Sequence, residues 1–168
     1  MPKMKVSTST ATDADAPSIA GVRNAVAAQL GTAYGEGPWS SRVTDDAVLR
    51  ELRQTHVLVA QVDGSVVATL RLASKKPWAI DTAYFSSVPK AVYLCGMAVD
   101  PAFQRRAIGR KLVSKAKALA RSWPSDAIRL DAYDSPAGAG PFYVSCGFRE
   151  VGRAVYRGVP LVYLELLL

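Results

Sequence analysis

An Asp-Gly pair separates two valine-rich runs near the middle of the chain. The runs cover residues 56–62 and 65–73, and only Asp63-Gly64 lies between them. A two-residue Asp-Gly connection favours the tight turn whose twist matches that of two antiparallel strands. The sequence therefore predicts a β-hairpin here, and the fold must contain an antiparallel sheet.

Further strands and helices are expected on both sides of this hairpin. Apolar runs and alternation predict strands over residues 6–10, 91–99, 128–133, 149–157 and 159–167. Helical spacing predicts a helix from Asp13 to Gly31, one that begins near Thr44, and two more over residues 108–121 and 140–145. Residues 75–90 are expected to form a long connection that carries several aromatic side chains. The predicted order, β-α-α-β-β-β-α-β-α-β-β, is that of a single α/β domain of mixed α+β type over residues 1–168.

Composition excludes several other classes of protein. With 168 residues, 49% apolar and 21% charged, the chain has the size and balance of one globular domain rather than a disordered segment. No apolar run approaches the roughly 18 residues of a membrane span. The basic residues at the start are followed by polar ones, without the apolar stretch of a secretory signal. We therefore expect a cytoplasmic protein that does not enter a membrane.

The few cysteine and histidine residues argue against metal chemistry. The chain has two cysteines, Cys95 and Cys146, and one histidine, His56, with no ligand-type spacing among them. The sequence therefore predicts no bound metal ion and no disulfide scaffold.

Excess positive charge is concentrated in one segment. The formal net charge is +7, and seven Lys and Arg residues lie between Pro101 and Ser125 without any acid. The first of them precede an expected helix N-terminus, where free N–H groups and the helix dipole favour an anion. A phosphate group fits this position. The alternatives are a solvated basic helix face or a module that contacts nucleic-acid phosphates, although no aromatic residue interleaves with the basic ones to stack on bases.

Two short motifs, in the same order, make the chain similar to the GNAT acetyltransferases. The first is a strand and the loop after it, Tyr93-Leu94-Cys95-Gly96-Met97-Ala98-Val99 and Gln104-Arg105-Arg106-Ala107-Ile108-Gly109-Arg110, which resembles the family motif Gln/Arg-x-x-Gly-x-Gly/Ala. The second is Phe142-Tyr143-Val144-Ser145-Cys146-Gly147-Phe148, which resembles Phe-Tyr-x-x-x-Gly-Phe. The resemblance covers nearly the whole chain. It implies a GNAT-like fold, in which helices flank a central mixed, mostly antiparallel twisted sheet.

The resemblance implies an N-acetyltransferase that moves an acetyl group from acetyl-CoA to a primary amine by direct attack. It implies that the coenzyme A pyrophosphate is bound by the loop of Gln104, Arg105, Arg106, Ala107, Ile108, Gly109 and Arg110. The backbone of Met97, Ala98 and Val99 would pair with the pantetheine arm as an added strand does. Gly96 marks either a bulge that opens this strand or a close packing contact.

Two departures from the family pattern affect the cofactor site. Ala107 occupies the first glycine position of the motif, so a methyl group lies where the backbone should approach the pyrophosphate most closely. Binding is expected to survive if Ala107 keeps helical dihedral angles. The asparagine often found between the two motifs is absent from residues 134–140, which weakens inferences about pantetheine contacts there.

The resemblance makes Tyr143 the candidate general acid that protonates the departing thiolate. The alternative is a buried tyrosine that packs the short helix. A strand amide near Met97 or Val99 is the candidate donor to the oxyanion. The general base is not identified: the acids considered are Glu36, Asp81, Asp131 and Asp134, each of which could instead be a solvated or capping residue. His56 and Cys95 are more readily explained as structural residues.

The acceptor is not identified from the sequence, and neither is the oligomeric state, for which a homodimer is one option. Two turn-rich segments, residues 34–41 and 75–90, carry aromatic residues that predict an acceptor pocket between them or, equally, a satellite core; they are Tyr34, Trp39, Trp78, Tyr84 and Phe85. Glu36 and Asp81 in the same segments would attract a cationic amine. A GNAT-like protein that binds coenzyme A without turnover is a further alternative.

Overall fold

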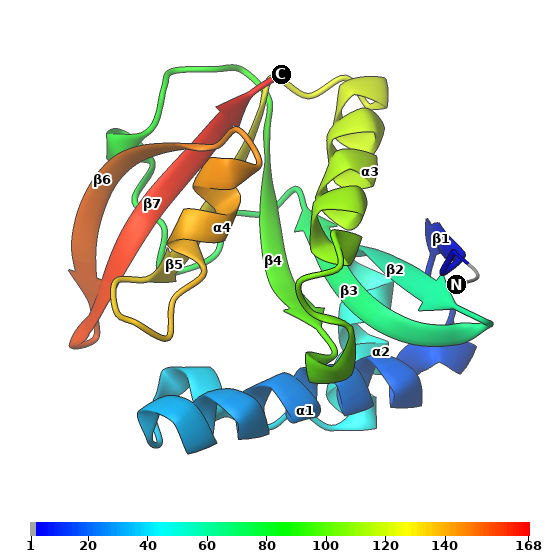
Figure 1. Cartoon of the computed structure of the whole chain (residues 1–168). Helices are drawn as coiled ribbons and strands as arrows, with labels where there is room; N and C mark the ends of the chain where they lie inside the picture. The colour runs from blue at the N-terminus through cyan, green and yellow to red at the C-terminus, as the bar shows by residue number, and fades with distance from the viewer. Residues whose placement is uncertain (1–2) are drawn as a thin grey trace. The chain divides into compact units, whose positions relative to one another are not determined.

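The computed structural model describes residues 3–168, and their element order agrees with the order predicted from the sequence (Figure 1). The strands are β1 (Val6–Thr10), β2 (His56–Val62), β3 (Ser65–Ala73), β4 (Ala91–Val99), β5 (Ala127–Tyr133), β6 (Arg149–Tyr156) and β7 (Val159–Leu167). The helices are α1 (Ala16–Tyr34), α2 (Asp45–Gln54), α3 (Ile108–Ser122) and α4 (Gly140–Ser145). No helix within residues 3–168 is both long enough and apolar enough to cross a membrane.

The strands form a mixed, mostly antiparallel sheet, as expected. Hydrogen-bonded neighbours follow the order β1-β2-β3-β4-β5-β7-β6, and the pair β4–β5 is parallel. The pairs β1–β2, β2–β3, β5–β7 and β6–β7 are antiparallel. The chain divides into two compact units, one with residues up to Leu72 and Cys95–Ala116, the other with Ala73–Leu94 and Lys117–Leu168.

In the first unit, the predicted hairpin joins β2 and β3. Asp63 and Gly64 both have positive φ angles, +51° and +79°, as the tight turn requires. Helices α1 and α2 cover one face of these strands, and α2 begins at the predicted cap, Thr44, whose side chain accepts a hydrogen bond from the Ala47 N–H. The apolar residues of this layer are Ala16, Ile19, Ala20, Val48, Val57 and Val59.

Helix α1 is longer than the sequence suggested. The chain forms a 3₁₀ turn over Asp13–Asp15, and α1 then continues through Gly31 to Tyr34. Gly31 is tolerated inside the helix, and a Cβ there would lie only 3.4 Å from Cβ of Ser40. Gly35, with φ +79°, ends the helix. The prediction that Gly31 ends this helix was therefore wrong.

In the second unit, a buried ion pair joins β5 to β7. Arg129 and Glu165 are register partners, only 6% and 2% exposed, and Nε of Arg129 lies 3.0 Å from Oε2 of Glu165. The same two side chains hold the long connection, because Nη2 of Arg129 donates to the Ser86 carbonyl and Oε1 of Glu165 accepts from the Ser86 N–H. Phe85 stacks with the guanidinium at 5.1 Å.

Removal of one partner of this pair should destabilise the protein strongly. Glu165→Ala leaves the Arg129 charge buried without its carboxylate, which typically costs about 3–5 kcal/mol of unfolding free energy. Urea denaturation measures the loss. Glu150→Ala, which removes one of the two partners of the exposed Arg153, is the matched control and should have little effect. Equal losses of unfolding free energy in the two variants would show that burial does not set the contribution of the Arg129–Glu165 pair.

Candidate active site

Strand β4 ends in a capped turn that directs the chain into the basic segment. The Asp100 N–H donates to the carbonyl of Val67 on β3 at 2.8 Å. The Asp100 carboxylate accepts from the Ala102 N–H at 2.9 Å and caps the short 3₁₀ turn Pro101–Phe103. These bonds fix the chain where it leaves the sheet.

The loop that follows has an unusual backbone. Arg105 and Ala107 both adopt left-handed conformations, with φ +61° and +63°, immediately before α3 begins at Ile108. Residues with side chains rarely adopt this conformation, and successive turns of this kind gather N–H groups into an anion-binding concavity. The condition that Ala107 keep helical dihedrals is therefore not met. The methyl group of Ala107 is accommodated in a conformation that favours glycine.

The side chains of the loop have largely structural contacts. Gln104 exchanges hydrogen bonds with Gln29 of α1 at 2.9 and 3.0 Å and donates to the Val99 carbonyl. The Arg106 guanidinium lies over the Phe103 ring at 5.6 Å. What the loop offers to a ligand is therefore mainly backbone N–H groups, with the exposed Arg105 side chain beside them.

The strand segment expected to pair with pantetheine lies beyond the parallel register of β4. That register with β5 runs from Ala91↔Ala127 to Tyr93↔Arg129. Met97, Ala98 and Val99 follow it, after Gly96, whose φ of +61° departs from strand geometry. Gly96 therefore interrupts the regular strand backbone, as a bulge at this position would require. A Cβ at Gly96 would also lie 3.2 Å from Nε of Arg71, as the packing explanation requires, while the opening of the strand stays a prediction.

Tyr143, the candidate general acid, lies in α4 in the second unit. Its side chain is buried, and its ring contacts those of Phe142 and Phe148 edge to face, with centroids 5.3 and 5.6 Å away. Its carbonyl accepts hydrogen bonds from the Cys146 and Phe148 N–H groups, which close the turn at Gly147. The motif residues thus fix the ring firmly in α4.

The acids considered as general bases have different environments. Asp81 caps the turn Thr82–Tyr84, and Asp134 pairs with Arg153. Asp131 on β5 has neither role, and burial raises the pKa of its carboxyl. Burial and the nearby Asp131 charge also raise the pKa of Tyr133. A carboxyl pKa raised by burial, as at Asp131, is common at functional sites.

The aromatic residues predicted to line an acceptor pocket have different roles. Tyr84 and Phe85 pack against Tyr163 at 5.3 and 5.4 Å, as a satellite core does. Trp78 is 83% exposed, and the Trp39 indole donates to the Gly35 carbonyl.

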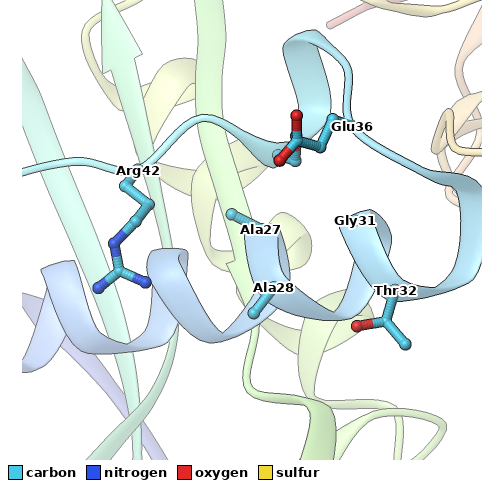
Figure 2. Close-up of a pocket in the computed structure, with 7 residues that line it drawn as sticks. Ala27, Ala28, Gly31, Thr32, Glu36 and Arg42 are labelled. Carbon is cyan, nitrogen blue, oxygen red and sulfur yellow. The ribbon is translucent and has the colours of Figure 1, made fainter.

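A pocket of about 280 Å³ opens between α1 and the segment after it (Figure 2). Ala27, Ala28, Gly31 and Thr32 of α1 line it, together with Glu36, Ser40 and Arg42. Glu36 is a candidate general base and could also attract a cationic amine. It lies in a polar pocket of the first unit.

One charged cluster was missed by the sequence analysis. Arg23 of α1 and Arg71 of β3 both approach one oxygen of Glu51 on α2, at 2.6 and 3.6 Å. The cluster is partly buried, and it combines residues from three elements far apart in sequence. The only local signal was Gly96, a strand glycine, since a Cβ there would lie 3.2 Å from Nε of Arg71.

Taken together, a mixed sheet and a left-handed loop before a basic helix define an α+β domain suited to a phosphate-bearing ligand. Residues 25–148 match the model of the Acetyltransferase (GNAT) family, so the chain belongs to this family. It is an N-acetyltransferase that uses acetyl-CoA as co-substrate. No curated protein matches the sequence significantly.

Solved structures share the fold at low sequence identity. A GCN5-related N-acetyltransferase from Rhodopseudomonas palustris is 18% identical with a TM-score of 0.75, over 100% of this chain and 99% of that one. A ribosomal-protein-alanine N-acetyltransferase from Brucella melitensis is 20% identical with a TM-score of 0.74, over 96% and 99%. The yncA protein from Salmonella typhimurium, solved with its cofactor acetyl-CoA, is 21% identical with a TM-score of 0.70, over 96% and 93%.

The raised pKa of Asp131 predicts how stability depends on pH. The folded protein binds this proton more tightly than the unfolded chain, whose carboxyl has the ordinary value near 3.8. The resulting stabilisation is complete below that value and is lost as the pH rises through the folded pKa. Asp131→Asn should therefore stabilise the protein at neutral pH, and the advantage should disappear in acid.

Urea denaturation over a pH series tests this expectation. Ultraviolet titration of tyrosine gives a second measurement, because loss of the Asp131 charge should lower the pKa of Tyr133. If Asp131→Asn instead stabilised the protein equally at every pH, the gain would come from side-chain packing and not from the charge of Asp131.

Proposed function

We propose that the loop from Gln104 to Arg110 binds the pyrophosphate of acetyl-CoA through its backbone. The observation that carries this proposal is the pair of left-handed residues, Arg105 and Ala107, at the N-terminus of α3. Left-handed turns direct N–H groups of the loop inward, and the first turn of a helix leaves further N–H groups unpaired. The residues present therefore fit a diphosphate, and Gln104, Arg105, Arg106, Ala107, Ile108, Gly109 and Arg110 form its site.

We propose that Met97, Ala98 and Val99 receive the pantetheine arm. An extended amide-bearing arm can hydrogen-bond to a strand edge as an added strand does. The irregular backbone at Gly96 and the end of the β4–β5 register at Tyr93 support an accessible edge over these residues. An N–H of Met97 or Val99 is then the natural donor to the oxyanion.

Bound acetyl-CoA supplies the reactive thioester, and the protein supplies orientation and proton transfer. In the direct reaction, a neutral primary amine attacks the acetyl carbon, a C–N bond forms and the C–S bond breaks. Tyr143 donates a proton to the departing sulfur, because a phenol and a thiol have comparable pKa values. The amine proton leaves to solvent or to a base that we do not assign.

A nucleic-acid role for the basic segment has less support. Lys111 donates to the Val6 carbonyl, and Arg106 stacks on Phe103, so two of the seven basic side chains are held in contacts within the first unit. We propose that the anion served by this segment is the phosphate of acetyl-CoA.

A carboxylate at the start of α3 should abolish cofactor binding. Gly109→Asp adds a negative charge where the diphosphate would lie. We therefore expect at least a hundredfold loss of acetyl-CoA affinity, which corresponds to about 2.8 kcal/mol of binding free energy. Calorimetry measures this affinity. Ser114→Asp adds the same charge to an exposed position of the same helix and should bind nearly as wild type. Unchanged affinity in a folded Gly109→Asp protein would exclude the site.

Loss of the Tyr143 hydroxyl should affect turnover rather than binding. In Tyr143→Phe the ring still packs between Phe142 and Phe148 but cannot donate a proton, so kcat should fall by roughly 10²-fold or more. Acetyl-CoA affinity, measured in parallel, should change little. A wild-type rate of the chemical step in single-turnover experiments would remove Tyr143 from the mechanism.

A further inference from the structure

The Arg71 side chain has an unsatisfied hydrogen-bonding group in the interior of the first unit. Its Nε is buried and has no hydrogen-bond partner among the described residues. A buried donor without a partner costs free energy, so such groups in folded proteins require an explanation. The nearest anion, Oε2 of Glu51, is 3.6 Å from this nitrogen, which is too far for a good hydrogen bond.

Glu51 is already committed to another arginine. The same Oε2 accepts a hydrogen bond of 2.6 Å from Nη1 of Arg23. Two guanidinium groups thus face one carboxylate, and the cluster has one positive charge in excess. Nε itself is buried, but the Arg71 side chain as a whole is about a quarter exposed, so part of it is open to a ligand. This arrangement fits one additional monoanionic group.

The position of Arg71 relates this charge to the proposed reaction site. On β3, Arg71 is the register partner of Val57, which belongs to the apolar layer under α1 and α2. Its Nε lies 3.2 Å from where a Cβ of Gly96 would be. The next residue is Met97, where the proposed pantetheine segment begins. The Arg71 guanidinium therefore lies beside the residue that precedes the backbone proposed to face the thioester.

We propose that Arg71 binds a carboxylate of the acceptor, and that the acceptor is a small amino acid whose amine lies close to that carboxylate. The planar guanidinium fork matches a carboxylate better than a point charge does. The single excess charge favours a monoanion over a phosphate dianion. The place of Arg71 beside Gly96, the residue before Met97, favours an α- or β-amino acid, whose amine is close to its carboxylate. This substrate class rests on the proposed function of the β4 segment.

The experiment compares paired acceptors that differ only in this charge. Thiol release from acetyl-CoA is measured with each of the L-amino acids, with β-alanine, and with the corresponding amides. We expect wild-type kcat/KM to favour the carboxylates by tenfold or more. Arg71→Gln should lower kcat/KM for the best carboxylate by about tenfold to a hundredfold, the range of a charge-assisted hydrogen bond, and should change the amide little.

Two further variants control for stability and for general charge effects. Arg50→Gln removes a charge from an exposed position next to Glu51 and should keep the preference for carboxylates. Arg71→Lys keeps the charge without the fork, so it should retain part of the preference. Acetyl-CoA affinity should be the same in all three variants, which shows that they are folded and that the cofactor site is intact.

A second measurement separates this inference from the proposed function. Binding of the N-acetylated amino acids and of their amides is measured by calorimetry in the presence of coenzyme A, without turnover. Loss of the carboxylate preference in Arg71→Gln but not in Arg50→Gln supports the inference. Equal use and equal binding of carboxylates and amides by the wild type would overturn it, as would acetylation only of amines without a carboxylate. If no amine is acetylated, the proposed function fails and the binding measurement alone decides the role of Arg71.

Discussion

The connection between β4 and α3 places two residues with side chains in a backbone conformation that favours glycine. A left-handed residue other than glycine costs about 1–2 kcal/mol, so Arg105 and Ala107 persist only because the surroundings hold them. Before the loop, Asp100 is fixed to Val67 and Ala102. Within it, Gln104 is held by Gln29 and by the Val99 carbonyl. The first unit thus holds the loop in a conformation suited to a diphosphate.

Most of the fold could be predicted because its signals are local. The Asp63-Gly64 turn, the Thr44 cap and the apolar runs each fix an element through neighbouring residues, and β2, β3, β4, α4 and β7 have the predicted bounds. The end of α1 could not be predicted in this way. Gly31 and Gly35 are both plausible end points, and only the contact of Gly31 with Ser40 and the positive φ of Gly35 distinguish them. Such contacts form between segments and leave no local pattern.

The candidate site shows the same division between local and distant signals. The proposed cofactor loop and the proposed general acid Tyr143 could be singled out because each belongs to a motif of consecutive residues. The left-handed conformation of Ala107 could not, since the sequence shows a departure from glycine but not the backbone angle that results. The Arg23–Glu51–Arg71 cluster was missed because strand register and helix packing assemble it. Three charges separated by many residues have no spacing that predicts their association.

Gly96 affects both the local backbone of β4 and the packing of the distant residue Arg71. Its positive φ interrupts the regular backbone of β4 before the segment proposed to receive pantetheine, and its missing side chain leaves room for the Arg71 guanidinium. A larger residue would be strained in this conformation and would also displace Arg71. One glycine therefore permits both the altered strand backbone and the approach of a partly buried positive charge. The two anion sites that we propose in the first unit, the backbone N–H groups of the loop and the Arg71 guanidinium beside Gly96, lie at opposite ends of the short segment Met97 to Val99. This separation suits a reaction in which a phosphate-bearing donor and an anionic acceptor must be held apart while their reactive ends meet.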